Sequence, residues 1–166
     1  MAFFDISGEF KNPVLQVLTK KNSTEVLYNN ASAGDYTVMT SDAITVTSGT
    51  TLLCFANYHW WMQDNDNQNS FHGRQYIQYE LNGSGSFSDA RAAGTATFEN
   101  ANMGTAYLNN RGEVSQITAI FTHGQSTGTT VKFRIVHRSV QPTSCDELVF
   151  QRNSNETNMI IMEVGN

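Results

Sequence analysis

Thr130–Ser139 reads TVKFRIVHRS, and this stretch indicates the fold class. It alternates between two kinds of side chain: apolar Val131, Phe133 and Ile135, and charged Lys132, Arg134 and Arg138. A period of two is the signature of a β-strand with one face in the core and one in water. We therefore expect a strand here.

The same alternation recurs roughly every ten to fifteen residues, between clusters of Gly, Asn, Asp and Ser. No amphipathic helical period extends over a useful length. The other expected strands are Asp35–Thr40, Asp42–Thr47, Thr51–Met62, Tyr76–Asn82, Val114–Thr122, Asp146–Arg152 and Asn158–Val164. A set of about eight strands predicts an all-β, two-sheet antiparallel jelly-roll sandwich. The loop HGQSTGT favours a hairpin between Val114–Thr122 and Thr130–Ser139.

Thr51–Met62 (TLLCFANYHWWM) is almost continuously apolar, which indicates a central or interfacial strand covered on both faces. Adjacent residues of a strand point to opposite faces, so Trp60 and Trp61 cannot both enter one core. Either one indole lies at a surface or interface, or the strand is buried between two layers. The candidate interface residues are Phe3, Phe4, Val14, Leu15, Tyr58, Trp60 and Trp61.

Residues 1–33 differ from the rest, because the apolar segments FFDISGEF and PVLQVL are followed by polar KKNST. We interpret residues 1–33 as an N-terminal arm or added strand and residues 34–166 as the jelly-roll domain. The arm could pair with the body or with the sheet edge of a neighbouring subunit. A plain extra strand of the chain's own sandwich is an equal alternative.

Charged residues make up 15% of the chain, well below the roughly 25% usual for soluble domains. The net charge of -5 disfavours nucleic acid and polybasic membrane binding as functions. The N-terminus has no basic and apolar secretory signal, so we expect assembly in a host cytoplasm rather than export. Cys54 and Cys145 are expected as free thiols, and a disulfide would require the fold to bring them together.

The residues offer little for catalysis or metal binding. His59, His72, His123 and His137 have no metal-ligand spacing, and Asp64–Asn69 lacks the Gly and Glu of a calcium loop. The loop Thr122–Ser126 (THGQS) fits a hairpin connection better than a nucleophile site. The acids Asp64, Asp66, Glu80 and Asp89 could supply the carboxylate pair of a glycoside hydrolase, but exposed carboxylates are common and the sequence does not give their separation. We expect no enzyme activity, metal or cofactor.

Four segments resemble the tumour-necrosis-factor-like jelly rolls of tailed-phage virion proteins. They are DAITV, SGT and TLLCFANY over residues 42–58, YIQYELNGS with ARAAG over 76–94, the closing segment 114–139, and NMIIMEVG at 158–165. The resemblance covers residues 35–165 as a pattern of elements. It implies a homotrimer that decorates a phage capsid and binds the major capsid protein, as a cement protein on the virion surface.

Two other functions stay open. The first is a tail-fibre or tail-tip module that binds a cell-surface glycan, with Trp60 or Trp61 stacking on the sugar. The second is a small hydrolase.

Overall fold

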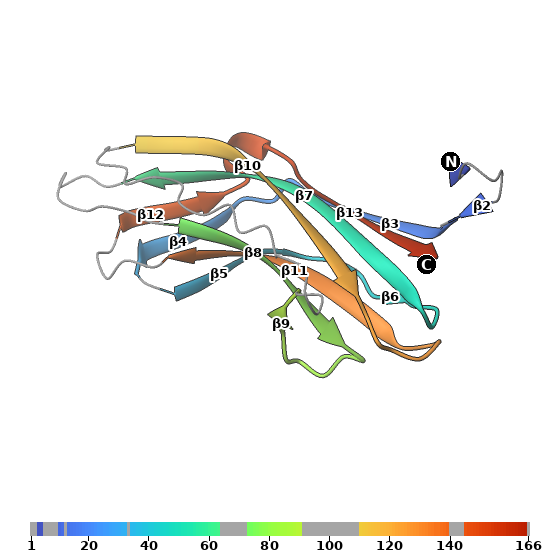
Figure 1. Ribbon diagram of the computed structural model, residues 1–166. Helices are drawn as coiled ribbons and strands as arrows, with labels where there is room; N and C mark the ends of the chain where they lie inside the picture. Colours follow the sequence, from blue (N-terminus) through green and yellow to red (C-terminus); the bar gives the residue numbers. More distant parts are fainter. Residues whose placement is uncertain are drawn as a thin grey trace.

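The computed structural model describes residues 3–4, 10–11, 13–32, 34–63, 73–90, 110–139 and 145–165. These residues form strands and one 3₁₀ turn, η1 (Arg152–Ser154), and no helix among them is long and apolar enough to cross a bilayer. The strands build two stacked antiparallel sheets (Figure 1), which confirms the predicted all-β sandwich.

The upper layer in Figure 1 is a six-stranded sheet. Its strands are β3 (Val14–Asn22), β4 (Val26–Ala31), β7 (Thr50–Gln63), β10 (Asn110–Thr122), β12 (Cys145–Phe150) and β13 (Thr157–Gly165). The long strand β7 is central: β10 pairs along one side of it, while β13 and then β12 pair along the other. β3 and β4 continue the sheet beyond β13 and β12. The sheet is therefore four strands wide: β10, β7, then β13 and β12 end to end, then β3 and β4 end to end.

The lower layer is a five-stranded sheet of β5 (Gly34–Thr40), β6 (Ile44–Thr45), β8 (Gly73–Leu81), β9 (Ser88–Asp89) and β11 (Thr130–Ser139). β11 lies in its middle, between β8 on one side and β5 and β6 on the other. Apart from both layers, β1 (Phe3–Phe4) pairs with β2 (Phe10–Lys11).

From β3 to β13 the chain passes from one sheet to the other at six of the ten connections, as in a jelly roll. The predicted hairpin of 114–122 with 130–139 is therefore wrong, because β10 pairs with β7 while β11 pairs with β5 and β8. The segments 42–46 and 51–58 are likewise split between the sheets, as β6 and β7. Alternation identifies a strand with one buried face, but it does not identify the strand's partner.

β3 and β4 both come from within residues 1–33 and are integral strands of the six-stranded sheet. Their pairing with the last two strands brings the beginning and end of the described chain together (Figure 1). The division of the chain at residue 33 stays a prediction.

The core lies between the sheets. Val131, Phe133 and Ile135 are fully buried there, as the alternation of β11 predicts. At one end the core is aromatic: Tyr58, Trp60, Phe150 and the imidazole of His137 have ring centroids 5.6 to 6.3 Å apart in four pairs. Two polar contacts lie at this end of the core: Trp60 Nε1 donates to Ser115 Oγ (3.2 Å), and Tyr58 Oη lies 3.1 Å from His137 Nδ1.

Candidate functional site: an exposed apolar sheet face

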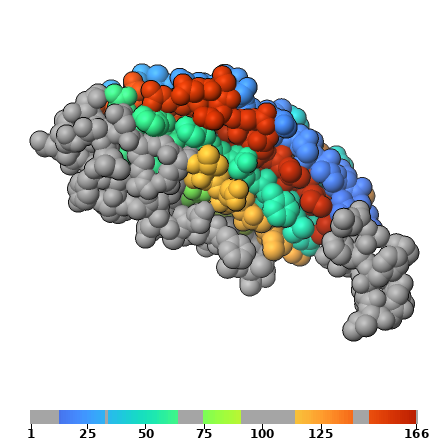
Figure 2. Space-filling view, turned by 90° about the horizontal axis from the view of Figure 1, so that it is seen from above, coloured from blue at the N-terminus to red at the C-terminus, as the bar shows by residue number. Residues whose placement is uncertain are grey.

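One face of the molecule is unusually apolar. Among the described residues, the exposed large apolar side chains all belong to the six-stranded sheet: Leu15, Val17, Leu27, Phe55, Val114, Ile120 and Ile160. Each alternates with core residues of its strand, so each points away from the sandwich. Figure 2 looks onto this outer face, where β3, β13, β7 and β10 run side by side as blue, red, teal and yellow bands.

The apolar side chains form rows across the strands. One row runs through Val17, Met162, Leu53 and Ile120. The next row runs through Thr19, Ile160, Phe55 and Thr118. Side chains directly opposite one another on neighbouring strands are close enough to touch, so the rows merge into one patch. A contiguous exposed apolar patch of this kind marks an interaction surface.

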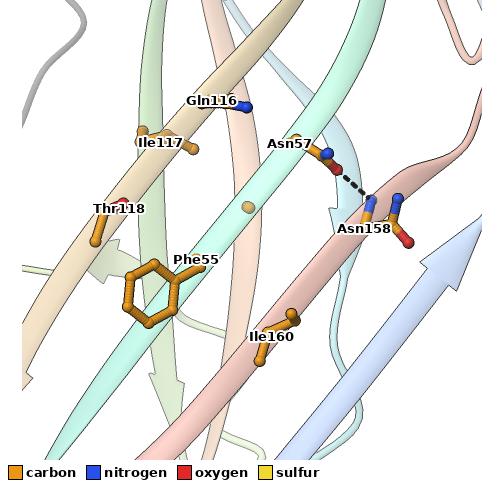
Figure 3. A pocket seen from close by; sticks show the side chains of 8 residues that line it. Phe55, Asn57, Gln116, Ile117, Thr118, Asn158 and Ile160 are labelled. Atoms are coloured by element: carbon orange, nitrogen blue, oxygen red, sulfur yellow. Dashed lines mark hydrogen bonds between the residues drawn. The ribbon is translucent and has the colours of Figure 1, made fainter.

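A shallow hollow lies within the patch. It has a volume of about 270 Å³ and lies over β7, β10 and β13, with Phe55 between Thr118 and Ile160 (Figure 3). Amide side chains line one end, where Asn57 Oδ1 accepts a hydrogen bond of 3.1 Å from the backbone N–H of Asn158. The hollow offers both apolar contact and hydrogen-bonding groups.

The outer face of the five-stranded sheet is different. Arg138 forms an ion pair with Asp35, and the buried Glu80 lies 3.8 Å from Lys132 Nζ. Arg134 donates to Gln78 Oε1 at 2.8 Å. The hydrogen bond from Arg138 lowers the pKa of Asp35. The polar groups of this face are bonded to one another, so the two outer faces differ in chemistry as well as in position.

The predicted interface residues are distributed unevenly. Leu15 is exposed, Val14 is half-buried, and Trp61 is half-buried on the outer face. Tyr58 and Trp60 do not reach the surface: they point into the core, with 0% and 1% of their area exposed. The opposite directions of Trp60 and Trp61 follow from their adjacency on β7. Phe3 and Phe4 lie in β1, and their side chains are outside the described residues.

A buried polar cluster, which the sequence did not reveal, lies at one end of the sandwich. Glu163 is fully buried, and its Oε1 accepts hydrogen bonds from Thr47 N and Thr50 Oγ1, both 2.6 Å. Its Oε2 accepts from the side chain of Gln16. Burial opposes ionisation, but the bonds from Thr50, Gln16 and Thr47 outweigh it and hold the pKa of Glu163 below its ordinary value.

His123 extends this cluster without making it catalytic. Its Nε2 lies 2.9 Å from Thr50 Oγ1, and its Nδ1 accepts from the backbone N–H of Gln125. Burial lowers the pKa of His123, and the Glu163 carboxylate offsets part of that shift. In a nucleophilic triad the carboxylate orients the imidazole. Here the Glu163 carboxylate accepts from the Thr50 hydroxyl instead of from His123. All three side chains are buried, and their hydrogen bonds connect β7 and β13 with the residue that follows β10.

The remaining candidate residues are the possible metal ligands and the two cysteines. No cluster of His, Cys, Asp and Glu among the described residues could hold a metal ion. Cys54 is a free, buried thiol, and burial raises its pKa to about 12. His72, the run Asp64–Asn69 and the side chain of Cys145 lie outside the described residues.

Comparison with known proteins yields distant similarities only. No protein family and no curated protein matches the chain. A chain in a structure of infectious bursal disease virus, Gx strain, matches with a TM-score of 0.44 and 10% identity over 92% of this chain and 33% of that one. The VP2 subviral particle of the same virus gives a TM-score of 0.40 and 8% identity over 90% and 39% of the two chains. This chain thus spans between a third and two fifths of the length of these proteins.

Proposed function

We propose that this chain is a structural protein of a virus particle that assembles into homotrimers through the outer face of the six-stranded sheet. The exposed apolar face is the observation that carries the proposal. Water is displaced when such a face is covered, and the gain scales with the apolar area removed from water. In a three-fold trimer the contact is heterologous, so the outer face of each copy packs against a different surface of the next copy.

The size of the face suits a specific protein contact. Four strand positions ~4.8 Å apart, followed over the ten steps of ~3.3 Å from Thr51 to Trp61, outline roughly 600 Å² before side-chain relief is counted. A standard interface buries about 800 Å² per partner, so the face supplies most of what is needed. Loops at its margin would add the remainder.

In the proposed role the trimer decorates a phage capsid and clamps neighbouring major capsid proteins, with no catalytic step. Contacts to several shell subunits add through high effective concentration, so weak individual contacts resist opening of the shell. The resemblance of residues 35–165 to phage jelly rolls supports this assignment, as does the low charge content. The surface of the virion is then the site of action.

A glycan-binding module of a tail fibre is the alternative, and one observation favours it. The hollow places the exposed ring of Phe55 beside the amides of Asn57 and Asn158, a combination that suits stacking and hydrogen bonding to a sugar. Trp60 is buried and unsuited to this role. Loss of glycan-array binding in Phe55→Ala would support the alternative over the trimer contact.

Charge substitutions on the face test the proposal. In Phe55→Glu and Ile160→Glu, carboxylates replace exposed side chains, so folding should persist while the trimer dissociates. Ser126→Glu carries the same charge on an exposed loop and serves as the control. Sedimentation velocity and far-ultraviolet circular dichroism report assembly and folding separately. Face variants that remain folded and trimeric would contradict the proposal.

Attachment to the shell has its own test. β3 is part of the sheet, so a truncation that spares the fold removes residues 1–12 only. If residues 1–12 anchor the trimer, this truncated chain should form trimers but no longer join virus particles. Unchanged incorporation would exclude these residues as the anchor.

A further inference from the structure

The turn at residues 151–156 has a strained backbone and places Arg152 over Trp61, on the outer face of β7. The segment 151–156 connects β12 to β13, and η1 lies within it. Three of its residues have left-handed backbone angles although none is glycine: Gln151 (φ 57°), Asn153 (φ 58°) and Ser154 (φ 60°). Such angles are sterically disfavoured for residues with a Cβ, and clusters of them occur at functional sites.

Buried hydrogen bonds fix the turn in this conformation. Gln151 is fully buried, and its backbone N–H donates to His59 O at 3.2 Å. In the amide orientation that satisfies every neighbour, its side chain accepts from Thr157 Oγ1 at 2.5 Å and donates to the carbonyls of Thr24 (3.2 Å) and Phe150 (3.1 Å). The turn is thus bonded to β7, β12, β13 and the connection between β3 and β4, so the position of its next residue is well determined.

That next residue, Arg152, lies on Trp61. Its guanidinium carbon is 4.3 Å from the centre of the Trp61 ring. A guanidinium carbon over the centre of a ring makes a cation–π contact, which uses none of the guanidinium N–H groups as hydrogen-bond donors to a polar partner. Among the described residues, these groups have neither a hydrogen bond nor an ion pair, whereas Lys20, Lys21, Lys132 and Arg138 all have carboxylate partners.

Two neighbouring nitrogens are also unsatisfied. Trp61 Nε1 and His59 Nδ1 are buried, and neither has a hydrogen-bond partner among the described residues. Buried polar groups are nearly always paired. The indole N–H of Trp61 can only donate, so beside an unpaired arginine it indicates a missing acceptor, whereas the role of His59 Nδ1 depends on its tautomer. Arg and Trp are also the residue types that dominate binding energy at protein interfaces.

We propose that Arg152, held over the ring of Trp61, binds a carboxylate side chain of a second copy of this chain; the inference rests on the proposed trimer. Two observations favour this occupant. The site continues the outer face along β7, because Trp61 points to the same side as Phe55. A second copy also has carboxylates to spare, with 15 acids against 10 bases. A bidentate arginine–carboxylate pair fixes orientation, which an apolar face alone does not provide.

The test compares Arg152→Gln with Lys20→Gln by sedimentation over a concentration and salt series. Lys20 alternates with the outer-face residues of β3, so it points away from the proposed contact, and it is already paired with Asp42, so it controls for loss of charge. We expect Arg152→Gln to weaken assembly about tenfold or more and to flatten its salt dependence, while Lys20→Gln assembles normally. Arg152→Lys should recover little, because lysine lacks the planar fork.

The remaining outcomes separate this inference from the proposed function. Normal assembly of Arg152→Gln, with dissociation of Phe55→Glu, would overturn the carboxylate site and leave the trimer contact standing. Trimers of Arg152→Gln that fail to join virus particles would place the acid on the shell instead of a second copy. A wild-type chain that stays monomeric would overturn both.

Discussion

Acidification should destabilise this protein through His137. Its imidazole is fully buried between the sheets, 3.1 Å from Tyr58 Oη and packed against Trp60 and Phe150. Burial lowers the pKa of His137 to about 3, from an ordinary value of 6.5. The cause is the loss of water around the charged form.

The sign and size of the effect follow from proton uptake. As the pH falls below about 6.5, the unfolded chain binds a proton at His137 while the folded chain does not, so the free energy of unfolding decreases. Each pH unit below 6.5 costs about 1.4 kcal/mol until the folded-state pKa is reached. At pH 5 the loss is about 2 kcal/mol, a large part of the 5–15 kcal/mol typical of a domain.

Urea unfolding at pH 7 and at pH 5 measures this effect. In His137→Asn the imidazole is replaced by an amide, and this amide can still bond to Tyr58 but does not titrate. The decrease in the free energy of unfolding between pH 7 and pH 5 should therefore be about 2 kcal/mol smaller than in the wild type. His59→Asn is the control, because that half-buried imidazole should contribute less. Protein concentration is held constant, since assembly also stabilises the fold. An equal pH dependence in wild type and His137→Asn would refute the reasoning.

Three further substitutions test other parts of the structure by thermal or urea unfolding. Trp60→Ala should cost about 3–5 kcal/mol, because it empties a site in the aromatic core; a cost below about 1 kcal/mol would show that Trp60 is not packed there. Glu163→Gln should cost about 1–3 kcal/mol, since an amide N–H₂ would meet a donor where a carboxylate now accepts three bonds; unchanged stability would mean that the cluster is not formed. Ser154→Gly should stabilise by up to about 1 kcal/mol by relieving a φ of 60°, and destabilisation would contradict the strained turn.

The strands could be predicted from the sequence because alternation is a local property. Val131, Phe133 and Ile135 face the core as their spacing indicates. The adjacency of Trp60 and Trp61 likewise requires that they point to opposite sides. It does not say which of them is inside, and that choice depends on the register of β7 with β10, β12 and β13.

The site could not be predicted, because its residues meet only through long-range pairing. Glu163 and Thr50 are 113 positions apart in sequence, and His123 is 73 positions from Thr50. The exposed patch draws on β3, β13, β7 and β10, whose neighbours are fixed by sheet order rather than by any local pattern. Arg152 is the last residue of the strand predicted at Asp146–Arg152. The alternation of side chains does not indicate that its neighbours Gln151 and Asn153 have left-handed backbone angles.

Sedimentation equilibrium of the unmodified chain at neutral pH tests the central claim most directly, because a covered face requires other copies. The chain has a mass of 18.4 kDa, and we expect the unmodified chain to sediment as a trimer of three times that mass. The Phe55→Glu variant should sediment as a monomer. A single species of 18.4 kDa across the accessible concentration range would contradict the account.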